Sequence, residues 1–139
     1  MREMKKITGL LMAMLLMLSA CGSVPLTGRK QVLLVSDQEV LSSSLTQYSD
    51  YMKSATKSSD KNESAMVTRV GKKIAAATEA YLKANGMESE IKNFQWEFNL
   101  VKDNQINAFC MPGGKIVVYE GLMLLVSSDV ELAVVVGHE

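Results

Sequence analysis

The residues best suited to chemistry are the last two of the sequence, His138 and Glu139, which follow an apolar run over residues 132–137. Adjacent His and Glu form the first half of the pattern His-Glu-x-x-His. In that pattern two histidines one helical turn apart hold a zinc ion, and the glutamate acts as general base on a water molecule. The sequence contains no second histidine. As written, it therefore predicts an incomplete and inactive fragment that does not bind zinc tightly.

The N-terminal segment has the composition of an export signal. Residues 1–6 are mostly basic and polar, and residues 7–18 are uncharged and mostly apolar, which predicts a signal peptide over residues 1–20. Its end, Leu18-Ser19-Ala20-Cys21, resembles the bacterial lipobox, in which the cysteine is joined to a diacylglycerol. We expect a lipidated Cys21, a tether over residues 21–30, and a location in the bacterial cell envelope, at the periplasmic face of the outer membrane. An ordinary signal peptide with an incidental cysteine is the alternative.

The remaining cysteine and the charge balance exclude two classes of protein. With Cys21 acylated, Cys110 has no partner, so no disulfide framework is expected. Cys110 lies in an apolar stretch, which favours a small buried hydrophobe over a nucleophile. The chain has 15 basic and 15 acidic residues among 139, and this balance gives no indication of a nucleic-acid partner.

Two amphipathic helices are predicted in the first half of the chain. Ser36 and Glu39 have the spacing of a capping box, so a helix should begin at Asp37, and its apolar residues recur every three and four positions. A polar loop follows from residue 54, and a second helix runs over residues 63–84. Because the loop is short, we expect the two helices to pack together as an antiparallel pair.

The second half changes from helical to alternating periodicity. It predicts three strands of a small antiparallel sheet, over residues 95–101, 106–111 and 115–119. A tight turn at Pro112-Gly113-Gly114 joins the last two strands. A second capping box, Ser128 with Glu131, predicts a final helix that begins near Asp129. That helix would carry His138 and Glu139.

Four short motifs in this half resemble metallopeptidase family forty-eight. They are Asn107-Ala108-Phe109, Pro112-Gly113-Gly114, Tyr119-Glu120-Gly121 and His138-Glu139. This family of gluzincin endopeptidases includes the CAAX prenyl protease and the heat-shock protease HtpX. The upstream Thr27-Gly28-Arg29 and Val35-Ser36 resemble its bacterial lipoprotein branch. The resemblance covers nearly all of residues 21–139.

The resemblance implies a fold and a set of roles. The fold would be α+β, with residues 31–139 as the N-terminal part of a zincin-like catalytic domain. His138 would be the first ligand of one Zn²⁺ per complete enzyme, and Glu139 the catalytic base. An extended peptide substrate would pair with an edge strand. The residues expected to form that substrate strand are Asn107, Ala108, Lys115, Ile116, Val117, Val118 and Tyr119.

The resemblance also implies a biological role. The complete protein would be a zinc-dependent metalloendopeptidase that cleaves unfolded or damaged envelope polypeptides in protein quality control, held at the membrane by the lipid on Cys21. A different class stays open from the residues alone. In that alternative the chain is a non-enzymatic envelope lipoprotein whose helices and sheet act by binding a partner.

Overall fold

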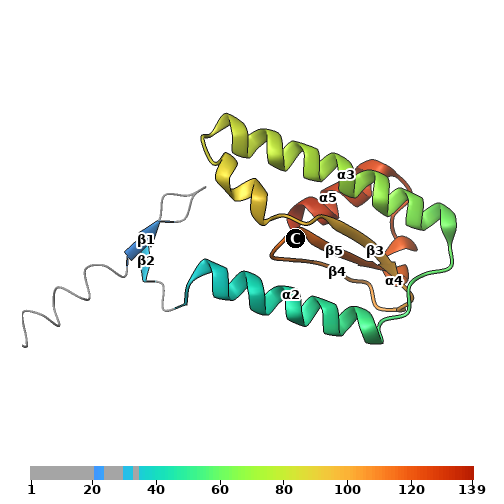
Figure 1. Cartoon of the computed structure of the whole chain (residues 1–139). Helices are drawn as coiled ribbons and strands as arrows, with labels where there is room; N and C mark the ends of the chain where they lie inside the picture. Colours follow the sequence, from blue (N-terminus) through green and yellow to red (C-terminus); the bar gives the residue numbers. More distant parts are fainter. Residues whose placement is uncertain (1–20, 24–29, 33–34) are drawn as a thin grey trace, which may run out of the picture. The chain divides into compact units, whose positions relative to one another are not determined.

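The computed structural model describes residues 21–23, 30–32 and 35–139 (Figure 1). The predicted signal peptide and most of the predicted tether lie outside the described residues. Two short strands, β1 (Cys21–Ser23) and β2 (Lys30–Val32), pair antiparallel in the first of two compact units, Met1–Glu39. The second unit, Val40–Glu139, contains a three-stranded sheet and all helical residues after Glu39.

The helix α2 (Asp37–Ser54) begins with the capping box that the sequence predicts. The Ser36 hydroxyl accepts a hydrogen bond from the Glu39 amide at 3.2 Å, and the Glu39 carboxylate accepts one from the Ser36 amide at 3.0 Å. The bond from the Ser36 amide, together with one from the Ser36 hydroxyl to the same carboxylate at 2.8 Å, holds the pKa of Glu39 below its ordinary value.

The helix α3 (Lys61–Ala84) starts two residues earlier than predicted, because Asp60 caps it. The Asp60 carboxylate accepts hydrogen bonds from the amides of Asn62 and Glu63, both at 2.9 Å. At the other end the chain turns at Gly86, whose φ of 71° lies in the left-handed region that favours glycine. A short 3₁₀ helix, η1 (Glu88–Asn93), which the sequence analysis did not predict, then leads to the sheet.

The three predicted strands form one sheet, but it is mixed rather than antiparallel. The strands are β3 (Glu97–Val101), β4 (Ala108–Met111) and β5 (Lys115–Tyr119), in the order β3-β5-β4. β5 pairs antiparallel with β4 and parallel with β3. The hairpin between β4 and β5 occupies one side of β5, so β3 pairs with the other side. The turn of this hairpin contains Gly113 and Gly114 at φ values of 88° and 77°.

The helices lie on both faces of this sheet. In Figure 1, α2 lies on one side of the strands, and α3 lies on the other side with α5 (Asp129–His138). The buried residues accordingly form two clusters. Val117 belongs to the cluster beneath α2, and its neighbours Ile116 and Val118 belong to the cluster beneath α3 and α5.

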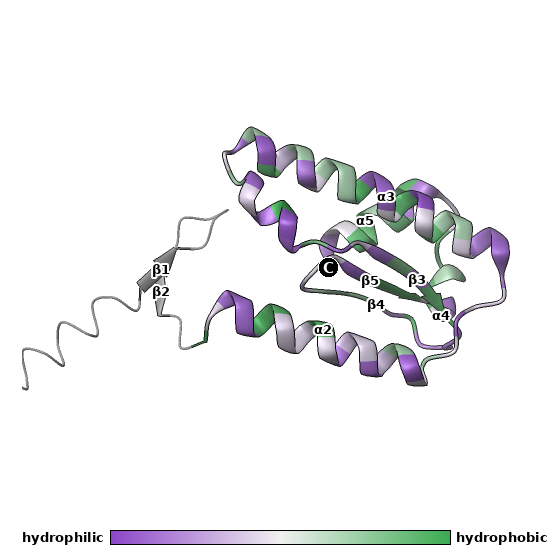
Figure 2. Ribbon diagram, viewed as in Figure 1, coloured by the Kyte–Doolittle hydropathy of each residue, from purple (hydrophilic) through white to green (hydrophobic). Residues whose placement is uncertain are grey.

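This arrangement corrects the predicted antiparallel helix pair. Each helix covers a different apolar face of the sheet, instead of packing against the other helix. Figure 2 shows hydrophobic residues along the strands between the two layers of helices. Within the described ranges, no helix combines the length and the apolar character that a membrane span requires.

A partly buried polar network joins α2 to the sheet. Lys115 is only 3% exposed, and its ammonium group donates to the Glu97 carboxylate at 2.6 Å and to the Gln95 carbonyl at 2.5 Å. The Tyr48 hydroxyl donates to the other oxygen of Glu97 at 2.9 Å and accepts from Asn99 at 2.7 Å. The hydrogen bond from Lys115 is the main reason that the pKa of Glu97 lies below its ordinary value.

One glycine of α3 is required by packing. A Cβ atom added at Gly71 would collide with the ring of Phe98 on β3, so the helix and the strand approach each other closely at this point. Gly137 in α5 offers a matched contrast, because an added Cβ would meet nothing within 4 Å.

We predict opposite effects of the same substitution at these two positions. Gly71→Ala should lower the free energy of unfolding by about 1–3 kcal/mol through overpacking. Gly137→Ala should raise it by about 0.5–1 kcal/mol, because alanine is the better helix former and has room. Urea unfolding followed by circular dichroism measures both, and a stabilising Gly71→Ala would contradict the packing of α3 on β3.

Candidate active site

The helix α5 carries His138 and Glu139, and its first turn is capped as the sequence predicts. The Ser128 hydroxyl accepts a hydrogen bond from the Glu131 amide at 3.3 Å. The second bond of the capping box differs from the prediction. The Glu131 carboxylate accepts a hydrogen bond from the amide of Ser127, at 2.7 Å, and not from the amide of Ser128. This bond is the main cause that lowers the pKa of Glu131. The start of α5 is therefore fixed by two consecutive serines.

Two kinds of contact hold α5 on the protein. Leu132 is fully buried and Val136 is 5% exposed, and both lie in the core beneath α3. At the first turn the Arg69 guanidinium donates two hydrogen bonds to the Asp129 carboxylate, at 2.7 Å and 2.6 Å. The bond from Arg69 holds the pKa of Asp129 below its ordinary value. The direction of α5 is thus set by burial on one face and by an ion pair at its start.

His138 and Glu139 lie exposed at the far end of this helix. The Glu139 amide donates to the Val135 carbonyl at 3.3 Å, which continues the helical hydrogen bonding to this residue. The helix α5 contacts β4. Partial burial, together with the charge of the Glu139 carboxylate, raises the pKa of the Cys110 thiol. Cys110 is an exposed residue of β4, which corrects its predicted burial, although its thiol is partly shielded.

The strand order corrects the predicted substrate strand. Residues Lys115–Tyr119 form β5, which is paired on both sides and therefore has no free backbone edge. In the part of the chain that the structure describes, the sheet ends at β3 and β4. The outer side of β3 is partly covered, because residues 56–58 bond to it through Lys57 and Ser58. The open edge is β4, which begins at Ala108 directly after Asn107.

The position of Cys110 on an edge strand was not predicted from the sequence. Its alternation with Phe109 and Met111, which pack in the cluster beneath α2, could have placed Cys110 on the opposite face of the strand. Which of the two strands in a hairpin is the outer one depends on a third strand, however, and no local pattern gives that order. The side chain of Cys21 lies outside the described residues, so its acylation stays a prediction.

The described residues do not fit a zinc ion by themselves. A catalytic zinc takes three protein ligands and an open position. In residues 35–139, no three side chains among His, Cys, Asp and Glu come together in a way that could hold a metal. His138 and Glu139 supply one imidazole and one carboxylate of such a site.

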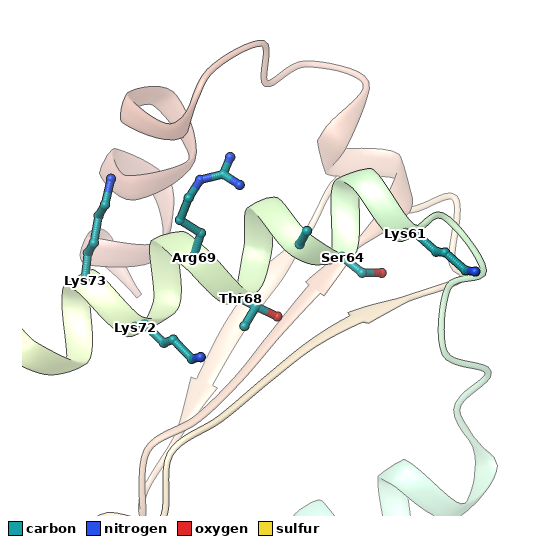
Figure 3. Close-up of a pocket in the computed structure, with 7 residues that line it drawn as sticks. Lys61, Ser64, Thr68, Arg69, Lys72 and Lys73 are labelled. Carbon is teal, nitrogen blue, oxygen red and sulfur yellow. The ribbon is translucent and has the colours of Figure 1, made fainter.

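A hollow of about 670 Å³ on the surface contains neither His138 nor Glu139. It is lined only by residues of α3, among them Thr68 and Lys72 (Figure 3). None of its lining residues belongs to the candidate site. We therefore attribute it to the outward surface of one helix.

Comparison with known proteins supports a peptidase. Residues 62–139 match peptidase family M48. The mitochondrial metalloendopeptidase OMA1 of Arabidopsis thaliana is 46% identical over 57 residues, which make up 41% of this chain and 12% of that protein. The protein of the same name from Schizosaccharomyces pombe is 37% identical over 51 residues, which make up 37% of this chain and 15% of that protein. The chain thus matches a small part of the length of these relatives.

These relatives overturn the predicted location. The sequence predicted a lipid-anchored protein at the periplasmic face of a bacterial outer membrane, whereas both relatives are mitochondrial metalloendopeptidases. That prediction is contradicted, and we withdraw it. The comparisons support the family itself, but neither its bacterial lipoprotein branch nor the CAAX protease and HtpX types.

We predict that the ion pair at the start of α5 stabilises the fold in a pH-dependent way. The pKa of Asp129 is depressed in the folded chain, so its contribution is fully present above the ordinary value of about 3.9 and is lost as pH falls through the lower folded value. Asp129→Asn should therefore destabilise the protein at pH 7, and the difference should shrink below pH about 4. Thermal unfolding across this range measures it.

The control for this prediction is a background that lacks the partner. In an Arg69→Gln protein, adding Asp129→Asn should have a smaller effect than in the parent, because the two-bond pair is already broken. Equal effects in both backgrounds would show that Asp129 stabilises α5 without Arg69.

Proposed function

The chain belongs to peptidase family M48, and from this premise we propose that it forms the first part of the catalytic domain of a zinc-dependent metalloendopeptidase. The observation that carries the proposal is the position of His138 and Glu139. They lie at the end of a capped helix, which is packed on a sheet and contacts the open edge strand β4. A histidine and a glutamate at the end of an isolated surface helix would have neither a fixed position nor an open strand edge beside them.

We assign a separate role to each of the two residues. The imidazole of His138 is one of the zinc ligands, and the further ligands come from outside the described residues. Zinc, when bound, supplies a Lewis acid that polarises the scissile carbonyl. The Glu139 carboxylate accepts the proton of the attacking water, which is general base catalysis. The exposure of Glu139 is compatible with this role.

The substrates are polypeptides in extended conformation, held on the outer edge of β4. The Tyr119 amide donates to the Asn107 carbonyl at 3.1 Å, so Asn107 is a hydrogen-bonded position of the antiparallel pair. Because such positions alternate, the backbone groups of Ala108 and Cys110 turn away from β5, toward the open edge. A peptide that pairs there would be bound mainly through its backbone. Asn107 and Ala108 thus keep their predicted place in the substrate strand, and Cys110 joins them.

We expect Glu139→Gln to abolish proteolysis without removing the metal. In the complete protein that carries this chain, casein cleavage should fall by about 10²–10⁴-fold, because the general base is lost. Zinc content by mass spectrometry should stay at one per protein, whereas the comparison variant His138→Ala should lose zinc. Unchanged cleavage by the Glu139→Gln variant would exclude Glu139 as the general base. A folded complete protein that never binds zinc would instead favour a binding protein.

A proline at Cys110 tests the peptide-binding edge. Cys110→Pro removes an outward N–H but no hydrogen bond to β5, so kcat/KM for an unstructured peptide should fall by about tenfold, the value of one lost hydrogen bond. The matched variant Cys110→Ala keeps the N–H and should stay within about twofold. Both variants should unfold at similar temperatures. Equal activity of the two would exclude backbone pairing at this position.

A further inference from the structure

A second cavity lies on the face of the sheet opposite α5. It has a volume of about 490 Å³ and is formed between α2 and the ends of β3 and β5 where these parallel strands begin. The lining residues are Leu45, Tyr48, Ser49, Met52, Lys53, Lys57, Gln95, Glu97 and Lys115. This volume is in the range of small-molecule sites. Because α5 packs on the other face of the sheet, the cavity is separate from His138 and Glu139.

The deepest charged group in this cavity is Lys115, which is 3% exposed. Its ammonium group uses two of its three N–H groups, on Glu97 and Gln95, and lies 5.5 Å from the centre of the Tyr48 ring. Its partner Glu97 has a side chain that is 51% exposed, so the ammonium group is buried whereas the carboxylate is partly in contact with solvent. Lys115 therefore places a buried positive charge at the wall of the cavity.

The lining of the cavity contains three lysines and one glutamate, so positive charge is in excess. One oxygen of the Glu97 carboxylate accepts from Lys115 and the other from Tyr48. Of the two further cations, Lys53 is paired with Asp50 at 2.8 Å. Lys57 has no ion-pair partner among the described residues, and its charge helps to lower the pKa of Glu97. One uncompensated cation thus lies at the rim of the cavity.

The position of Lys57 is fixed by the backbone. The neighbouring Ser58 amide donates to the Leu100 carbonyl at 2.9 Å, and the Lys102 amide donates to the Thr56 carbonyl at 2.8 Å. These bonds hold the segment that contains Lys57 along β3. The backbone of Lys57 is thus fixed beside Val101, at the other end of β3 from Glu97, and its exposed side chain contributes to the lining of the cavity.

The other walls are suited to a peptide group and an apolar side chain. Leu45, Met52 and the ring of Tyr48 provide apolar surface, whereas Ser49 and Gln95 provide neutral hydrogen-bonding groups. Positive charge, amide-binding groups and an apolar wall occur together in a space of this size. The C-terminal residue of a peptide presents the complementary set, which is a carboxylate, an amide and a side chain.

We propose that this cavity binds the C-terminal end of a peptide that has an apolar last residue. The carboxylate is bound at Lys57 and Lys115, and the last side chain contacts Leu45 and Met52. The site is separate from the proposed catalytic residues. Its occupation requires neither zinc nor the Glu139 carboxylate.

The test uses N-acetyl-L-leucine as the probe and N-acetyl-L-leucinamide as the uncharged control compound. Titration of the ¹⁵N-labelled full chain, followed by two-dimensional NMR, should give saturable shifts at amides of the cavity residues. The acid should bind about tenfold more tightly than the amide, because it alone carries a negative charge that can form an ion pair with the lysines. Equal affinities, or shifts without saturation, would overturn the proposal.

Matched lysine variants locate the charge. Lys57→Gln should weaken binding of the acid by about threefold or more, which is the scale of a partly exposed ion pair. Lys72→Gln makes the same change on α3, which covers the other face of the sheet (Figure 3), and should stay within about twofold. Both lysines are exposed, so both variants should keep the parent spectrum. Equal effects of the two variants would overturn the assignment to this cavity.

A fatty acid serves as the competing ligand. Octanoate carries the same carboxylate and an apolar chain but has no amide group. Tighter binding of octanoate than of N-acetyl-L-leucine would reassign the cavity to fatty acids and overturn the peptide-end assignment. Because none of these measurements involves proteolysis, their failure leaves the proposed peptidase function untouched, and loss of peptidase activity leaves this site untouched.

Discussion

The central position of β5 is the constraint on which the rest of this unit depends. The strand is paired with β3 on one side and β4 on the other, and its residues Val117 and Val118 are fully buried on opposite faces of the sheet. Because both faces of β5 are apolar, each must be covered by a helix. This requirement separates α2 from α3 and α5. It also leaves β4 as the open edge of the described sheet, so the same strand that organises the core decides where an extended peptide can pair.

The two faces of the sheet are built by different physical means. Beneath α3 and α5 the contacts are apolar, and Leu132 connects the final helix to this core. Beneath α2 a smaller apolar cluster is joined by the network of Lys115, Glu97 and Tyr48. Apolar burial holds α5 on the sheet, which would fix the position of the residues that we propose as catalytic. The residues of the polar network instead form part of the lining of a cavity.

The features that could be predicted from the sequence are those fixed by neighbouring residues. The capping residues Ser36 and Ser128 placed the starts of α2 and α5 correctly, and the β-branched run gave β5 with its observed ends. The strand order could not be predicted, because the parallel pairing of β3 with β5 joins segments that are distant in the chain. The burial of Lys115 could not be predicted either, since a lysine at the start of a strand usually faces solvent.

An open strand edge is a liability, because its unpaired backbone groups can join another chain. The two edges of the described sheet are covered to different extents. The outer side of β3 is partly covered by the segment around Lys57, whereas no described segment pairs with the outer side of β4. β4 has only four residues, which limits nonspecific pairing. The helix that ends at His138 and Glu139 contacts this strand. A short edge strand, left unpaired among the described residues beside the proposed general base, is the arrangement expected where a peptide approaches that base by pairing with the sheet.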